Sequence, residues 1–128
     1  MEPILSAERA CLICIVEDDD AVRASVKFLL EAVGYTVNEH DSAESLLADA
    51  AAEKAHVILT DYQLGGMTGL DLLDRLRERG NRARAILMTA NSNHSAERCR
   101  RAGVLTVLQK PVPAEDLLAW IESACAGC

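Results

Sequence analysis

The chain has 128 residues, half of them apolar, and carries a formal net charge of −7. This length allows one domain with a substantial core, and the apolar fraction excludes a disordered chain. The negative charge argues against direct nucleic-acid binding, which needs a basic face, and the apolar runs are far shorter than the ~20 residues that span a bilayer. The first ten residues do not resemble a secretory signal, so we expect a cytoplasmic protein without membrane insertion.

Strand-type and helix-type patterns alternate along the chain. Short, largely apolar runs predict strands at residues 12–16, 56–60, 85–88 and 104–108, and a further short strand is expected at 35–39. Apolar residues at helical spacing predict helices at about 22–33, 43–50, 70–76 and 117–124, and a weak helix is expected at 95–102. Gly34 ends the first helix, and Asp41 with Glu44 has the spacing of a capping box at the start of the second.

Five strand–helix units with nearly continuous apolar strands indicate an α/β fold with a parallel sheet covered on both faces. Sheets of this kind bind ligands beyond the carboxyl ends of their strands, near the point where the strand order reverses. The residues that directly follow the predicted strands are therefore the first place to look for function.

Polar side chains stand at four of these strand ends. Asp61 follows the third strand, while Glu17 and Asp18 follow the first. Thr89 follows the fourth strand and Lys110 lies just past the fifth. Because the carboxyl ends of parallel strands meet at one edge, we expect acids, a hydroxyl and an amine to share one charged pocket.

Five short motifs carry a resemblance to a known family, and they stand in the family's order: Val16-Glu17-Asp18-Asp19-Asp20, Thr60-Asp61-Tyr62-Gln63, Met67-Thr68-Gly69, Met88-Thr89-Ala90 and Gln109-Lys110-Pro111. Together they resemble the receiver domains of bacterial two-component response regulators, the CheY-like superfamily. The similarity covers about residues 11–124. It implies a flavodoxin-like, doubly wound sheet of five strands in the order 2-1-3-4-5 with five helices.

The resemblance also implies a role for each pocket residue. Asp61 matches the phosphoacceptor, and Thr89 and Lys110 match the hydroxyl and amine that contact the phosphoryl group. The metal would be Mg²⁺, held by Asp18, Asp61 and the main-chain carbonyl of Gln63, with Glu17 acting through a water. Independently of the resemblance, carboxylates that converge on one cavity repel each other, and a divalent cation that prefers oxygen ligands relieves this repulsion.

The chain departs from the family pattern in the region that would transmit the signal. Gly65 stands where the family usually has proline, and Val107 stands where an aromatic side chain usually changes rotamer. The segment between Thr89 and Lys110 is one residue shorter than usual, and its helix at 95–102 has almost no apolar stripe. We therefore expect an atypical fourth helix and do not assume the usual phosphorylation-induced dimer.

The five cysteines allow more than one interpretation. Cys11 and Cys14 form one CxxC pair, and Cys125 and Cys128 form another. Residues three apart on a strand point to opposite faces, so the first pair is poorly placed to chelate a metal. In an alternating β/α fold Cys11 can lie near the C-terminal pair, which leaves a zinc site or a disulfide open. Structural or incidental cysteines are the favoured interpretation for an intracellular protein.

The leading hypothesis is a single receiver domain over residues 1–128, without an output domain and without the turnover of an enzyme. It would accept a phosphoryl group on Asp61 from a histidine kinase or a histidine phosphotransfer protein and signal to an unknown downstream protein by contact. One alternative is a degenerate receiver that acts only as a binding module. A weaker one is a haloacid-dehalogenase-like phosphohydrolase, a class that usually has a second acid where this chain has Gln63.

Overall fold

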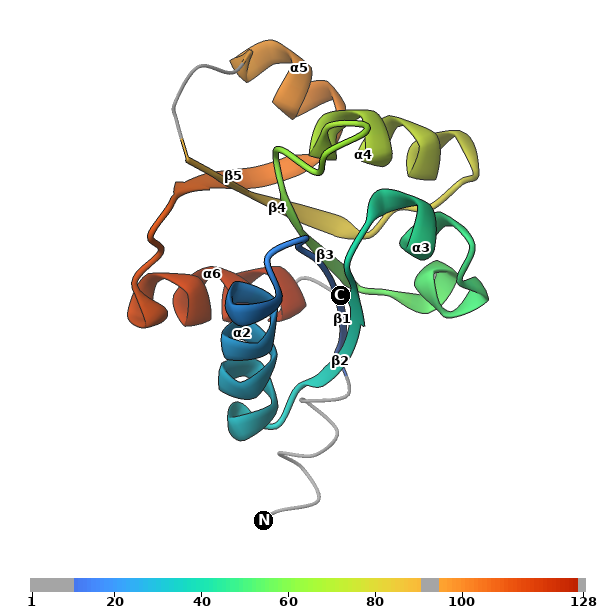
Figure 1. The fold of residues 1–128 in the computed structure, drawn as a ribbon. Coiled ribbons are helices and arrows are strands. Elements are labelled where there is room, and N and C mark those ends of the chain that lie inside the picture. Colours follow the sequence, from blue (N-terminus) through green and yellow to red (C-terminus); the bar gives the residue numbers. More distant parts are fainter. Residues whose placement is uncertain (1–10, 91–94, 127–128) are drawn as a thin grey trace.

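The computed structural model of the chain describes residues 11–90 and 95–126 (Figure 1). Its centre is a parallel sheet of five strands in the order β2-β1-β3-β4-β5. The strands are β1 (Leu12–Val16), β2 (Thr36–His40), β3 (Val57–Asp61), β4 (Arg84–Thr89) and β5 (Val104–Gln109). The predicted fold class and strand order are confirmed.

Five α-helices cover the sheet in the described part of the chain. Helices α2 (Asp20–Val33) and α6 (Ala114–Ala126) lie on one face, as Figure 1 shows. The other face carries α3 (Ala43–Leu47), α4 (Gly69–Glu78) and α5 (Ala96–Arg101), and a short 3₁₀ helix, η1 (Ala50–Lys54), follows α3. The fold is therefore doubly wound.

Strand β1 illustrates why both faces need helices. Ile13 and Ile15 pack in the apolar layer beneath α2 and α6, whereas Cys14 and Val16 pack in the layer beneath α3, α4 and α5. All four side chains are fully buried, because alternate residues of a strand point to opposite faces. This explains why the strand is continuously apolar in sequence instead of alternating.

The ends of α2 and α3 test the predicted capping residues. Gly34 ends α2 in the left-handed conformation, as predicted, with φ of 112°. The prediction for α3 was wrong in detail, because its N-cap is Ser42, which accepts a hydrogen bond from the Ser45 amide, and not Asp41. Asp41 lies one residue outside the position from which a side chain reaches the first free amides of the helix.

Helix α5 is short, as its weak apolar stripe predicted. It spans six residues and has one buried member, Cys99. Ser95 caps its first turn by accepting a hydrogen bond from the Arg98 amide. Arg98 also binds Asp71 and Asp74 of α4, at 2.7 and 3.0 Å, so ion pairs supplement the small apolar contact.

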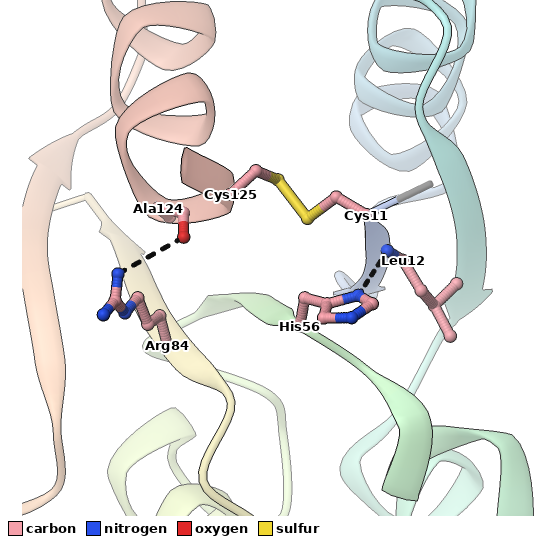
Figure 2. The surroundings of a disulfide bond; sticks show 6 residues. All are labelled: Cys11, Leu12, His56, Arg84, Ala124 and Cys125. Carbon is pink, nitrogen blue, oxygen red and sulfur yellow. Dashed lines mark hydrogen bonds between the residues drawn. A yellow bond between two sulfur atoms is a disulfide. The ribbon is translucent and has the colours of Figure 1, made fainter. Parts of the chain in front are cut away.

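The cysteines are the main correction to the sequence-based interpretation. Cys11, just before β1, and Cys125, in the last turn of α6, form a disulfide (Figure 2). These two residues are therefore not incidental, and the structure has the disulfide that the sequence had left open as the less favoured interpretation. The bond joins the two CxxC pairs and does not close either of them, whereas Cys14 and Cys99 are free and buried. Cys128 lies outside the described residues.

Candidate functional site

The register of the sheet aligns the polar strand ends. Val16 pairs with Thr60, so Glu17 follows β1 beside Asp61, the last residue of β3. Asp61 in turn pairs with Met88, which places Thr89 next to it on β4. Thr89 pairs with Gln109, and Lys110 comes directly after. Strand pairing alone therefore brings the predicted pocket residues to one edge of the sheet.

Lys110 joins the acids across three strands. Its Nζ lies 2.8 Å from Oε1 of Glu17 and 2.9 Å from Oδ2 of Asp61, and it donates a hydrogen bond to each. Glu17 is 1% exposed and Asp61 is 7% exposed, so both carboxylates are nearly removed from water. Removal of Lys110 would leave the buried Glu17 without its cation, and an unpaired buried charge strongly destabilises a fold.

Burial and ion pairing act on these groups in opposite directions. Burial raises the pKa of Glu17 and the nearby Asp61 adds to this, while the hydrogen bonds from Lys110 and from the Asp19 amide lower it. For Lys110, burial alone would lower the pKa, but its hydrogen bonds to Glu17 and Asp61 outweigh burial and raise it. Lys110 therefore remains a cation at neutral pH, and its hydrogen bond and charge lower the pKa of Glu17 against the effect of burial.

The acidic side of the pocket fits a divalent cation. Oxygen atoms of Glu17, Asp18 and Asp61 all lie within 4.8 Å of one another, and Asp18 is exposed at the opening. Three carboxylates face a single lysine here, so negative charge is in excess. Carboxylate oxygens at this spacing suit a hard cation such as Mg²⁺, which keeps several waters and takes few protein ligands.

The loop after Asp61 shapes the pocket through its backbone. The Gln63 amide donates to Oδ1 of Asp61 at 3.3 Å and orients the carboxylate. Gly65 has φ of +85°, a conformation that its glycine accepts without strain and that the family's usual proline cannot adopt. With glycine at position 65, the backbone of this loop therefore follows a course that differs from that of relatives with proline there.

Gly69 is a site residue whose role the sequence did not reveal. A Cβ on Gly69 would lie 2.5 Å from the carbonyl oxygen of Asp61, so only glycine fits. Its amide donates to the Tyr62 carbonyl at 2.7 Å, which ties the start of α4 to the residue after the aspartate. The motif Met67-Thr68-Gly69 drew attention to this position, but the close approach of two backbones is visible only in the fold.

Arg23 is a second residue that the sequence left unassigned. Its Nη1 donates to the main-chain carbonyl of Glu17 at 2.8 Å, and its other nitrogens bind Asp20 and Glu39. The guanidinium thus holds the acidic loop against the first turn of α2 and the end of β2. Its i,i+3 position relative to Asp20 was the available sequence signal.

The remaining predicted residues lie where expected, although their roles stay predictions. Thr89 is 3% exposed at the end of β4, and its carbonyl accepts the Lys110 amide at 2.8 Å. Val107 is partly buried on β5 and packs against the layer beneath α3, α4 and α5. Over residues 11–90 and 95–126, no helix is long and apolar enough to cross a membrane.

Comparison with known proteins agrees with this geometry. Residues 13–122 match the family model of the response regulator receiver domain. The chain is 33% identical over 111 residues to the transcriptional regulatory protein FixJ of Azorhizobium caulinodans, covering 86% of this chain and 53% of that protein. It is 32% identical over 112 residues to the tetrathionate response regulatory protein TtrR of Salmonella typhimurium, covering 86% and 54%.

Solved structures show the same relationship. A CheY-like receiver domain protein from Methanospirillum hungatei superimposes with a TM-score of 0.80 at 30% identity, covering 92% of this chain and 95% of that one. The crystal structure of FixJ-N matches with a TM-score of 0.80 at 29% identity over the same shares. The chain belongs to the response regulator receiver family. It spans about half the length of FixJ and TtrR, the curated relatives named above.

Proposed function

We propose that this receiver domain accepts a phosphoryl group on Asp61 from a histidine kinase or a histidine phosphotransfer protein, in a reaction that requires Mg²⁺. The observation that carries the proposal is the contact of Lys110 with both Glu17 and Asp61 at the mouth of a three-carboxylate cluster. An ion pair that only stabilised the fold would not need a third carboxylate, Asp18, exposed beside it.

The residues of the pocket divide the chemistry between them. The Asp61 carboxylate attacks the phosphorus of a phosphohistidine, so that a P–O bond forms while the P–N bond breaks and the imidazole leaves with the bond electrons. Lys110 would offset charge on the phosphoryl oxygens, and the Thr89 hydroxyl would donate to one of them. The leaving imidazole takes up a proton from solvent.

The cation would be held by residues of the acidic cluster. Asp18 and Asp61 would bind it directly together with the Gln63 carbonyl, and Glu17 would act through a water. When bound, Mg²⁺ reduces the repulsion between the anionic nucleophile and the incoming phosphoryl group. In this proposal Lys110 and the cation together would offset the negative charge of the phosphoryl group and of Asp61.

The phosphorylated domain would signal by protein contact in the cytoplasm. Gly65, Val107 and the short α5 distinguish the surface after Asp61 from the family pattern, so we expect a partner-specific readout and not the usual dimer. A domain that works alone, without an output domain, also stays a prediction.

Two alternatives predict different behaviour. A degenerate receiver that serves as a binding module would not label on Asp61, yet every pocket residue that labelling needs is present in this chain. A phosphohydrolase would turn over small phosphorylated substrates, which membership of the receiver family does not favour.

The test is incubation with acetyl phosphate and Mg²⁺, followed by intact mass measurement. We expect one added phosphoryl group on the wild type, loss of the adduct in Asp61→Asn, and retention in the control Asp116→Asn, an exposed acid on α6. Wild type that stays unlabelled, while a control receiver labels, would contradict the proposal. An adduct that survives in Asp61→Asn would show that a residue other than Asp61 accepts the phosphoryl group.

A further inference from the structure

The disulfide between Cys11 and Cys125 connects the two ends of the domain. The residues are 114 positions apart in sequence, and their Cα atoms are 5.9 Å apart, a distance typical of disulfides. The bond joins the start of β1 to the last turn of α6 (Figure 2). Nothing in the phosphoacceptor pocket requires it, because that pocket lies at the opposite ends of the strands.

Non-covalent contacts connect the residues that neighbour the two cysteines, Leu12 and Ala124. The Leu12 amide donates to Nδ1 of His56 at 2.9 Å, and the His56 amide donates back to the Leu12 carbonyl at 2.9 Å. The Arg84 amide donates to the His56 carbonyl at 3.0 Å, and Arg84 Nη1 lies 3.5 Å from the Ala124 carbonyl. Figure 2 shows the side-chain members of this path, from the neighbour of one cysteine to the neighbour of the other.

This path does not depend on the sulfur–sulfur bond. Apolar packing supports it, since Cys11 and Cys125 both adjoin the layer that contains Ile13, Leu117 and Ile121. Cleavage of the bridge would therefore leave two thiols close together in a folded domain. Such a pair can close again without a search through the unfolded chain.

The other described cysteines, Cys14 and Cys99, are buried free thiols with low reactivity. Burial raises the pKa of the Cys14 thiol to about 12, and Asp49 adds to the effect. Burial also raises the pKa of Cys99. Thiols of this kind carry almost no thiolate at neutral pH and exchange slowly. The bridge is thus the redox-capable pair among the described cysteines.

We propose that Cys11 and Cys125 form a reversible redox modification site, which a dithiol reductant opens and a disulfide oxidant closes. The proposal does not depend on phosphorylation of Asp61. The reversibility of the bridge rests in part on the cytoplasmic location in the proposed function, because a disulfide in a reducing compartment is more often regulatory than permanent.

The exchange proceeds in two balanced steps. A thiolate of the reductant attacks Sγ of Cys125, which is only partly buried, and forms a mixed disulfide as Cys11 leaves as a thiolate and is protonated. The second thiol of the reductant then attacks the mixed disulfide and releases Cys125. The net change is two electrons and two protons moved from the dithiol to the protein. The reverse sequence restores the bridge.

The physical effect of closure is on the unfolded chain. A bridge that spans 114 positions restricts the denatured ensemble of almost the whole domain, and the entropic stabilisation grows with loop length. We expect the thermal midpoint of the reduced protein to lie on the order of 10 °C below that of the oxidised protein. The C-terminal turn of α6 should show the largest increase in amide hydrogen exchange, since it loses its covalent attachment.

The test compares the full chain in oxidised glutathione and in dithiothreitol under native conditions, with thiol counts, peptide mapping and thermal midpoints. We expect a Cys11–Cys125 peptide in the oxidised sample, two additional thiols and the lower midpoint after reduction, and recovery after reoxidation. Cys125→Ser should lack the redox response. Cys128→Ser, its neighbour in the same CxxC pair, should retain it.

Three results would overturn the proposal. The first is a wild type whose thiols stay free under mild oxidant, and the second is a midpoint that is equal in both redox states. The third is a bridge that dithiothreitol opens only after denaturation, which would mark it as permanent. If Cys125→Ser does not fold, peptide mapping of the wild type still decides, because it needs no variant. No phosphoryl donor is present, so these results are independent of the proposed phosphotransfer.

Discussion

The contact between Gly69 and the Asp61 backbone makes a sharp prediction for Gly69→Ala. The added Cβ would lie 2.5 Å from the Asp61 carbonyl oxygen and 3.0 Å from Cδ2 of Leu87. The first partner is backbone at the end of a central strand and has little freedom to move. Overpacking of this kind costs about 1–3 kcal/mol, and relaxation would displace the carbonyl of the phosphoacceptor itself.

Gly66→Ala, in the loop just before α4, is the matched control. There a Cβ would meet only the side-chain oxygen Oε2 of Glu44, at 3.5 Å, an ordinary contact with a flexible group. We expect its free energy of unfolding to stay within about 0.5 kcal/mol of wild type. The two variants change glycine to alanine a few residues apart, so they separate the steric effect from the general effect of replacing glycine.

Urea unfolding measures the loss of stability, and acetyl phosphate labelling measures the effect of a displaced Asp61 carbonyl on phosphorylation. We expect Gly69→Ala to lose about 1–3 kcal/mol and to label more slowly than Gly66→Ala at a temperature where both are folded. A Gly69→Ala protein as stable and as readily labelled as the control would refute the close approach of α4 to Asp61 on which the reasoning depends.

Two further predictions concern the charged groups. Lys110→Met leaves the buried Glu17 without its cation, so we expect the free energy of unfolding in urea to fall by about 3 kcal/mol and labelling to be slow. The control Lys54→Met, at an exposed lysine, should behave as wild type. Equal stability of the two variants would contradict the ion pair. Burial lowers the pKa of His40 below its ordinary value of 6.5, despite the opposing effect of Asp49, so its stabilising contribution is present above pH 6.5 and is lost as the pH falls. The urea midpoint should therefore decrease more between pH 7.5 and pH 5.5 for wild type than for His40→Gln. An equal decrease in both proteins would show that His40 is not the group responsible.

Local patterns in the sequence were sufficient for the elements of the fold. The buried strands are short apolar runs, and the helices repeat their apolar residues at helical spacing, because each element depends mainly on which side it buries. The order of the sheet and the roles expected of Asp61, Thr89 and Lys110 came from the resemblance carried by the five motifs. The exact start of a helix was harder to predict where two neighbouring residues can both act as the N-cap. Ser42 and Asp41 are both good N-cap residues, and only the start of α3 decided between them.

The amino-acid sequence by itself thus determined an alternating α/β chain with acids, a hydroxyl and an amine at its strand ends. Only the tertiary structure decided which atoms meet. Lys110 reaches Glu17, 93 positions away, because β5 and β1 are held in one sheet by the strands between them. The same long-range pairing brings Cys11 to Cys125 and the backbone of Gly69 to Asp61. Sequence periodicity reports on the neighbours along one element, whereas contacts between elements depend on strand order, register and packing together.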